Sequence, residues 1–267
     1  MVAFGVIHVI RTTVLFSIIL TTGTSLNIGG IIWASIAGAS VVFTALFYFY
    51  ALAREDASRI APVLAVVPAF TIIFAVLLFR DIPTYLQIFG LIIASTGIFI
   101  LAVKPENGRL YFAKKIPFLA ALASSFFAAW VMIALDEASS HVSVLTSEAF
   151  RTLAVSIILP LVFFRKKHFA GVYKSLRNYK TLTLFFIAEG VLAPGFMLLT
   201  NYAVSVGPVG PIGIIFTSIS PVTVLIIASI LSTSRLQILD EVLNRETLAY
   251  KILGTLLVIS SVVALRI

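Results

Sequence analysis

Long runs of apolar residues, separated by short polar segments, recur along the whole chain. Runs such as Leu91–Leu101 contain no charged position and no alternation of apolar and polar residues. A membrane β-barrel would alternate them with a period of two, so this pattern argues against strands. Backbone groups in lipid must bond within their own segment, and about 20 apolar residues cross the hydrocarbon core as a helix. The pattern therefore predicts an all-α, polytopic transmembrane helix bundle.

The spacing of these runs predicts nine spans. They cover residues 1–20, 29–52, 57–79, 83–103, 116–135, 142–164, 182–203, 208–232 and 247–266. The first segment has Arg11 in its middle and no basic start, so we interpret it as a span and not as a cleavable signal peptide. Three longer polar connections remain, at 104–115, 165–180 and 232–246; the last is amphipathic and suits a membrane interface.

Composition supports a membrane protein over a soluble one. The 267 residues are 60% hydrophobic and only 11% charged, whereas soluble domains are about 25% charged. Most Lys and Arg residues behind the net charge of +8 lie in the predicted loops on one side. We expect that side to face the cytoplasm of a cell membrane, with no nucleic-acid partner. The chain has no cysteine and its histidines are isolated, so we expect no metal and no cofactor.

Small residues recur every fourth position within two predicted spans. They are Ala34 and Gly38 in the second span, and Ala120, Ala121, Ser124, Ser125, Ala128 and Ala129 in the fifth. Small side chains at this spacing let helix backbones approach closely, which is how spans associate in lipid. These stripes predict a packed bundle.

The chain also contains an internal duplication. The matching pairs, in the same order, are Ile10–Thr12 with Phe150–Thr152, Ser17–Leu20 with Ser156–Leu159, Tyr50–Ala51 with Tyr202–Ala203, Pro68 with Pro221, and Gly90 with Gly254. Four predicted helices match four others, while 116–135 has no counterpart. We expect a first repeat at 1–103, a connecting loop at 104–115 and a second repeat at 116–267. A unit of five helices, an odd number, inserts its two copies in opposite orientations, and such inverted repeats are typical of transporters.

These residues resemble the EamA-like transporter family of the drug/metabolite transporter (DMT) superfamily. Ala51-Leu52, Pro68 and Gly90 fit the family pattern in the first repeat, and Pro221, Glu246 and Gly254 fit it in the second. Arg80-Asp81 stands where the family pattern has Gly-Glu. The resemblance implies a ten-helix fold of two inverted halves, here lacking the first helix. It also implies a secondary carrier or exporter of a small polar or amphipathic metabolite, working by alternating access.

Two other functions are alternatives to a carrier. An intramembrane enzyme acting on lipid or peptide is the main alternative, but the sequence has neither His-Glu-x-x-His nor Gly-x-Ser-x-Gly. A channel would favour a repeated filter motif, and none is visible. We therefore expect no enzymatic activity. The expected partners are a small-molecule solute and the lipid bilayer.

Several residues within the spans are candidates for lining a solute cavity. They are Arg11, Arg151, Glu148, Glu189, Trp130, Asn201, Pro68 and Pro221. A charge inside a membrane faces a cavity or a partner, so Arg11 and Arg151 could line the solute path. Alternatively, each lies near a helix end and extends its charge to the membrane interface, or pairs within the bundle. Glu148 lies three positions before Arg151, which predicts an ion pair on one helix face. Glu189 is interpreted as a proton-coupling or amine-binding group, or as a partner of Arg151 or Asn201.

The prolines and Trp130 carry two interpretations each. Pro68 and Pro221 occupy matching places in the two repeats, and each is expected to kink its helix. The freed carbonyls could coordinate a solute, or the kinks could serve packing alone. Trp130 is either a cavity wall or a membrane-interface anchor.

Overall fold

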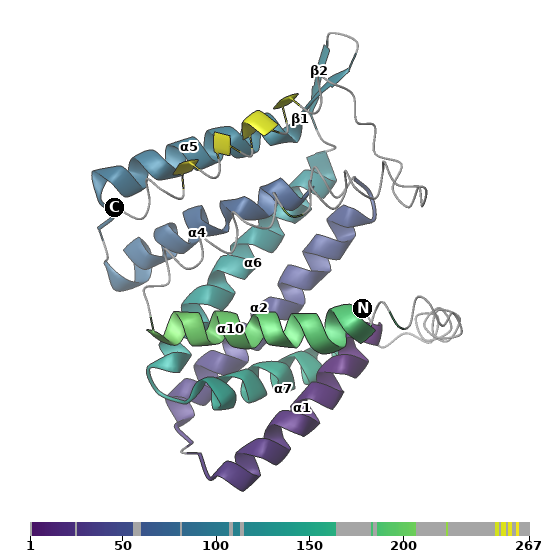
Figure 1. Ribbon diagram of the computed structural model, residues 1–267, viewed down its shortest axis with the longest axis vertical. Helices are drawn as coiled ribbons and strands as arrows, with labels where there is room; N and C mark the ends of the chain where they lie inside the picture. Colours follow the sequence, from purple (N-terminus) through teal and green to yellow (C-terminus); the bar gives the residue numbers. More distant parts are fainter. Residues whose placement is uncertain are drawn as a thin grey trace. The chain divides into compact units, whose positions relative to one another are not determined.

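The structure is a computed structural model that describes most of the first two thirds of the chain. Described are residues 2–24, 26–55, 60–80, 82–106, 109–112, 115–163, 183, 186–206, 223, 249–250, 252–254, 256–257 and 260–261. The helical elements are α1 (Val2–Thr22), α2 (Ile28–Leu52), η1 (Ala61–Val66), α4 (Val67–Phe74), η2 (Ala75–Phe79), α5 (Tyr85–Ala102), α6 (Lys115–Ser139), α7 (Val144–Phe163), η3 (Phe186–Leu192) and α10 (Ala193–Val206) (Figure 1). One hairpin, β1 (Val103–Glu106) and β2 (Arg109–Phe112), joins α5 to the α6 region.

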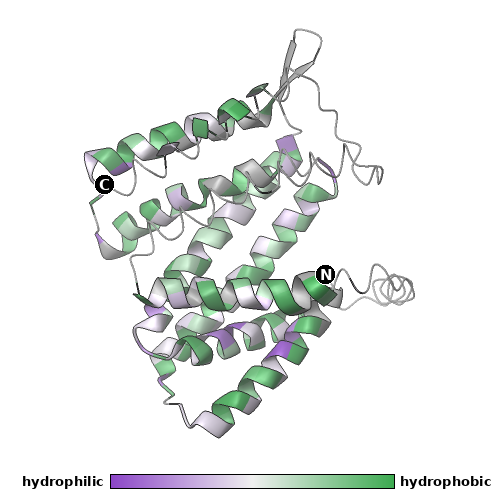
Figure 2. Ribbon diagram, in the orientation of Figure 1, coloured by the Kyte–Doolittle hydropathy of each residue, from purple (hydrophilic) through white to green (hydrophobic). Residues whose placement is uncertain are grey.

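Three described helices are long and apolar enough to cross a membrane: Ile28–Leu52, Lys115–Ser139 and Val144–Val162. Shorter apolar helices cover Ile7–Thr22, Val67–Leu78 and Tyr85–Gly97. Figure 2 shows these helices as mostly hydrophobic ribbons, with hydrophilic bands on α1 and α7. The described parts of the predicted spans are largely helical, which supports the all-α prediction, and three of these helices have the length and composition of a membrane span. The predicted helix 208–232 and most of 247–266 lie outside them, as do the loops 165–180 and 232–246.

The chain folds into two compact units that do not follow the sequence repeats. One unit contains Met1–Phe43 and Trp130–Val209, and the other contains Thr44–Ala129 and Gly210–Ile267. The long helices α2 and α6 each contribute their two ends to different units. Each unit therefore draws on both halves of the duplicated sequence.

In the first unit, α1 and α7 pack against each other in opposite directions (Figure 1). Thr24, just beyond α1, bonds Thr146 near the start of α7, whereas Thr12, nearer the start of α1, bonds Ser156 farther along α7. Leu15 and Ile19 of α1 form a buried apolar cluster with Ala149. α10 packs on α7, and η3 contacts both α1 and α10.

In the second unit, the small residues of α6 lie where the sequence predicts close packing. Ser124 donates a 2.9 Å hydrogen bond to the carbonyl of Thr44 on α2. Ala120 and Ala121 pack in a buried cluster with Ala51, Ile60 and Val63. Phe47 and Phe127 stack beside it, with ring centroids 5.8 Å apart. The small residues thus bring α6 against both α2 and η1.

The segment 57–79, predicted as one span with a kink at Pro68, is helical over its described residues 60–79 but changes helix type along its length. A 3₁₀ segment (η1) leads into the short α4 and then into a π-helical segment (η2). Pro62 and Pro68 lie in the first positions of η1 and α4, where a missing N–H costs least. The change of helix type therefore follows from two prolines six positions apart.

The polar connection 104–115 contains a β-hairpin that the sequence analysis did not predict. Val103 pairs with Phe112 and Glu106 with Arg109, in antiparallel register. The sequence between the two strands is Asn107-Gly108, the residue pair that most favours a two-residue hairpin turn. The pair Asn107-Gly108 would have predicted this hairpin, but the charged residues around it favoured a polar loop.

Candidate functional site

The first unit contains a buried cluster of three charged side chains. Arg11 Nη2 of α1 donates to Glu148 Oε1 at 2.7 Å. Arg151 donates to the same carboxylate twice, from Nε to Oε2 at 2.8 Å and from Nη2 to Oε1 at 2.5 Å. The side chains of Glu148 and Arg151 are each 1% exposed, and that of Arg11 is 10% exposed. One carboxylate thus accepts three hydrogen bonds from guanidinium groups on two helices.

The depth of this cluster in the helices makes pairing necessary. Arg11 lies near the middle of the 21-residue α1, about 15 Å from either end at 1.5 Å per residue. Arg151 lies about 10 Å from the start of α7. A charge at such depth is costly in a membrane unless it is paired and hydrogen-bonded. The predicted ion pair between Glu148 and Arg151 is confirmed, and Arg11 joins it within the bundle.

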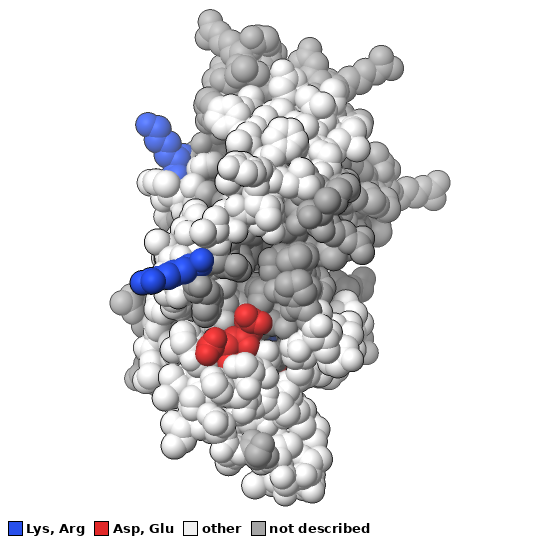
Figure 3. All heavy atoms as spheres, turned by 90° about the vertical axis from the view of Figure 1, so that its left-hand side faces the viewer, with Lys and Arg blue, Asp and Glu red and all other residues white. Residues whose placement is uncertain are grey.

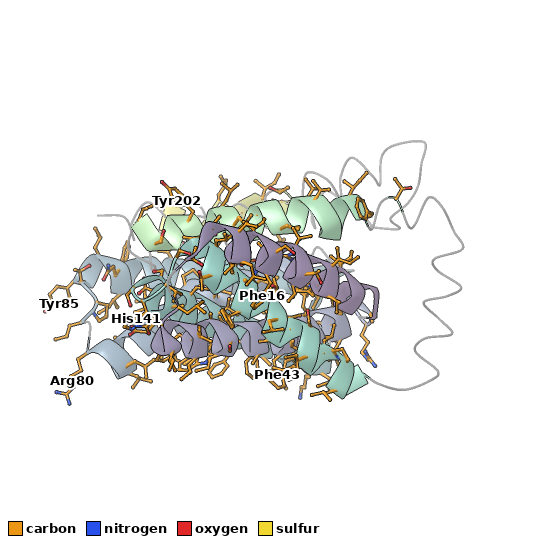
Figure 4. All side chains as sticks on the ribbon, turned by 90° about the horizontal axis from the view of Figure 1, so that it is seen from below. Phe16, Phe43, Arg80, Tyr85, His141 and Tyr202 are labelled. Atoms are coloured by element: carbon orange, nitrogen blue, oxygen red, sulfur yellow. The ribbon has the colours of Figure 1, made fainter. Side chains whose placement is uncertain are left out.

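Polar and aromatic contacts hold α1 against α7 around the cluster. The hydroxyl groups of Thr12 and Ser156 lie 3.0 Å apart. Phe16 packs edge-on against Phe150 at 5.2 Å between ring centroids, and Figure 4 shows its side chain among the helices. His8, one turn before Arg11 and Thr12, is buried at 2% exposure. The interface between these two helices is therefore polar at its centre, unlike the apolar outer faces.

A stripe of small residues on α2 fixes the backbone at Arg151. A Cβ atom added to Gly38 would collide with the carbonyl oxygen of Arg151 and lie 2.7 Å from the Cβ of Ala154. Ala34 is fully buried, and a Cβ on Gly30 would lie 2.7 Å from Val142. The sequence analysis identified Ala34 and Gly38 but missed Gly30, which extends the same four-residue spacing.

The other predicted site residues are distributed between the two units. Trp130, which is partly buried, lies in the same unit as the charged cluster, on α6. Glu189 lies in η3 and Asn201 in α10 of that unit, and their side chains are outside what the structure describes. Pro68 is buried in the other unit, at the start of α4. Pro221 lies outside the described residues.

The carbonyls near Pro68 that the sequence analysis offered to a solute accept hydrogen bonds within the protein. In a regular α-helix Pro68 would leave the carbonyl of Leu64 without a donor; here the N–H of Val67 bonds it. The carbonyl of Val63 accepts a 3.0 Å hydrogen bond from Ser125 Oγ of α6. Both carbonyl groups at this break in the helix therefore accept hydrogen bonds from donors within the protein.

Two further residues of α7 were missed. Pro160 lies inside the helix, and a mid-helix proline is readable from the sequence. Ser147, beside Glu148, has a buried hydroxyl with no hydrogen-bond partner in the described part of the chain. No sequence signal separates this hydroxyl from the many that bond their own helix.

The outer faces of the described helices are apolar. Leu20 is 82% exposed, Leu77 71% and Leu161 75%. Among the described residues on the face drawn in Figure 3, few side chains are charged. Among the described residues, no three His, Asp or Glu side chains lie close enough together to hold a metal. Apolar outer faces around buried, paired charges define an integral membrane protein.

Comparison with known proteins gives the family. Residues 1–103 and 115–266 match the EamA-like transporter family, so the chain belongs to that family of the drug/metabolite transporter type. A solved crystal structure, described only as that of a protein, shares the fold with a TM-score of 0.65 at 16% sequence identity; the match covers 99% of this chain and 88% of that one. No curated protein matches the sequence. The family consists of membrane transporters.

Proposed function

We propose that the protein is a secondary transporter that carries a small polar or amphipathic solute across the cell membrane by alternating access. In this proposal the two repeats, 1–103 and 116–267 joined by 104–115, have inverted orientations. They form the nine-helix arrangement expected from the sequence. Alternating access requires two similar halves that exchange conformations around one site.

The observation that carries this proposal is the convergence of two repeat-related arginines on one carboxylate. Arg11 follows Ile10 and precedes Thr12, and Arg151 stands in the same place between Phe150 and Thr152. Both guanidinium groups bond Glu148. The helices that carry them run in opposite directions, as inverted copies of one helix would. A charged site shared by corresponding helices suits a solute path on the axis between the repeats.

We assign the solute path to the residues identified from the sequence. Arg11, Glu148 and Arg151 form its charged part, and the remaining members are Glu189, Trp130, Asn201, Pro68 and Pro221. Glu189 lies in a π-helical segment, a geometry that is frequent at functional sites, and this segment contacts α1. An acidic group inside a span is a natural carrier of a coupling proton. We therefore assign proton coupling to Glu189.

Transport by the purified protein in lipid vesicles tests this proposal. We expect solute to accumulate faster with an imposed proton gradient than without one. Glu189→Gln should remove the dependence on the gradient. The matched control is Glu137→Gln, at the end of α6, where the carboxylate is 32% exposed and lies 3.5 Å from His141. This control should leave the gradient dependence unchanged.

Two results would contradict the proposal. If no solute enters the vesicles above the protein-free level, the chain is not a carrier on its own. If lipids or peptides are instead chemically altered, the intramembrane-enzyme alternative is favoured. Gradient-dependent uptake that survives Glu189→Gln would remove Glu189 as the coupling residue and leave the carrier intact.

A further inference from the structure

The carboxylate of Glu148 shows what kind of group the two arginines are arranged to hold. It accepts from Arg151 Nε and Nη2 through its two oxygens, and from Arg11 Nη2 through Oε1 alone. A planar guanidinium matches the two oxygens of a carboxylate, which is why paired bonds of this kind are specific as well as strong. The first unit therefore contains a preformed carboxylate-binding arrangement, occupied by one of its own side chains.

The two ion pairs respond differently to a movement of α1. Glu148 and Arg151 lie three positions apart on α7, so a movement of α7 as a rigid helix keeps this ion pair intact. The bond from Arg11 to Glu148 crosses from α1 to α7. A separation of the two helices would break this bond and leave Glu148 paired with Arg151. Arg11 is therefore the charge that helix movement can transfer to another anion.

A second observation on the same turn of α7 also points to a ligand. Neighbouring hydroxyls of α7 have hydrogen-bond partners: Ser156 bonds the carbonyl of Thr152, Thr152 bonds that of Ala149, and Thr146 bonds the hydroxyl of Thr24. The hydroxyl of Ser147 is fully buried and has no partner among the described residues. Ser147 lies four positions before Arg151, on the same face of α7. A buried hydroxyl without a partner is destabilising, so it marks a place where an additional polar group would be favourable.

We propose that Arg11 is the specificity-determining residue of the carrier and that it binds the carboxylate of an anionic solute in place of Glu148. Arg151 keeps Glu148 while this exchange takes place, and Ser147 supplies a further donor to the bound anion. The inference rests on the proposed transport function and names its substrate class.

The first test does not require transport. Glu148→Ala removes the internal carboxylate, and acetate supplies the same methyl and carboxylate atoms that the substitution takes away. We expect acetate to raise the melting temperature of purified Glu148→Ala protein by about 2–4 °C, with acetamide and sodium chloride at equal ionic strength giving no such rise. Adding Arg11→Gln to Glu148→Ala should reduce the acetate effect, because one of the three hydrogen bonds to the carboxylate is lost while the two from Arg151 remain. Equal stabilisation by acetate and acetamide would overturn the proposal.

The second test measures specificity in vesicles, and it decides the matter if Glu148→Ala protein does not fold. The vesicles are offered an equimolar mixture of carboxylates and the primary amides of the same acids, and their contents are measured by mass spectrometry. We expect carboxylates to be favoured by about tenfold, as the loss of one charged hydrogen bond predicts. Arg11→Gln should remove this preference, and Arg11→Lys should keep part of it.

The matched control is Thr13→Val, next to the cluster on the exposed side of α1, where the hydroxyl bonds only Val9 of its own helix. It should keep the wild-type preference. Uptake without a preference for carboxylates, or a preference unchanged by Arg11→Gln, would overturn the inference but not the carrier function. An absence of all uptake would contradict the carrier function and leave the acetate result to stand alone.

Discussion

Arg11 and Glu148 are 137 positions apart in the chain, yet their side chains form a 2.7 Å ion pair that links α1 to α7. Arg151 bonds the same carboxylate more extensively and is more deeply buried. Because Arg151 makes two of the three hydrogen bonds to Glu148 and Arg11 makes one, alanine substitutions of the three residues should lower the stability of the protein by different amounts. Glu148→Ala should be the most destabilising change, because it leaves two arginines without their carboxylate. Breaking a buried pair from one side typically costs about 3–5 kcal/mol.

Arg151→Ala should cost less than Glu148→Ala, and Arg11→Ala the least, since Glu148 then keeps both bonds from Arg151. Thermal unfolding of the three variants in one detergent would measure this order. If Arg11→Ala proved as damaging as Glu148→Ala, the bond across the two helices would be the main stabilising contact, contrary to this prediction.

Gly38 is predicted to be intolerant of even one added methyl group. The added carbon would meet the backbone carbonyl of Arg151, which cannot move as a flexible side chain would. We expect Gly38→Ala to lower stability by about 1–3 kcal/mol, the usual cost of overpacking. Gly195→Ala is the control, because nothing in the described part of the chain lies within 4 Å of the added atom. Equal melting temperatures for the two variants would show that α2 and α7 are not in this close contact.

Ser125 is predicted to hold the 3₁₀ segment η1 in place. Its hydroxyl bonds the carbonyl of Val63 across helices and that of Ala121 within α6. Ser125→Ala should cost about 1 kcal/mol and speed hydrogen exchange over Ala61–Val66. Ser35→Ala is the comparison, since that hydroxyl bonds only Ile31 of its own helix. Unchanged exchange over η1 in Ser125→Ala would remove this role.

Arg80 is predicted to be strained. It caps the π-helical segment in the left-handed conformation, with φ of 55°, which side chains other than glycine adopt at a cost. The family pattern has glycine at this place, so Arg80→Gly should raise stability by about 1 kcal/mol. Arg80→Ala removes the charge but keeps the Cβ atom and should bring no such gain. A gain in both variants would point to the charge instead of the backbone.

The ends of α5 are predicted to lie on opposite sides of the membrane. The helix is 18 residues long, about 27 Å, and leads from Tyr85 to the basic hairpin that begins at Val103. Tyr85 and Arg80 both point away from the helices in Figure 4. Basic loops favour the cytoplasm, so the hairpin should face inward.

The natural absence of cysteine makes this orientation simple to measure. In intact cells, an impermeant maleimide should label Ile82→Cys and should label Leu110→Cys only after permeabilisation. The reverse pattern would invert the orientation, and labelling of both positions in intact cells would show that α5 does not cross.

The sequence predicts the described spans well because hydropathy alone determines where a chain enters and leaves lipid. The prediction 29–52 compares with α2 at Ile28–Leu52, and 142–164 with α7 at Val144–Phe163. The break at Pro62 and Pro68 was harder, since two prolines can kink a helix or change its type. Which of the two occurs depends on whether a hydrogen-bond donor lies close to the freed carbonyl groups. Here that donor is Ser125, which lies on another helix.

The site was predictable in part for the same reason. Glu148 and Arg151 are close in sequence, so helix geometry alone pairs them. The addition of Arg11 depends on which faces of α1 and α7 meet, and hydropathy carries no information about that. The duplication gave a hint, because Arg11 and Arg151 occupy matching positions. Gly30 and Ser147 became recognisable only when their neighbours on other helices were known.

The order in which the ribosome makes these residues has a consequence for assembly. Glu148 follows Arg11 by 137 positions, so α1 is synthesised with Arg11 long before this carboxylate exists. Glu148 and Arg151 emerge together and can enter the membrane as a neutral pair. The ion pair between Arg11 and Glu148 forms only when α7 arrives, so α1 is made early but reaches its final contact with α7 late.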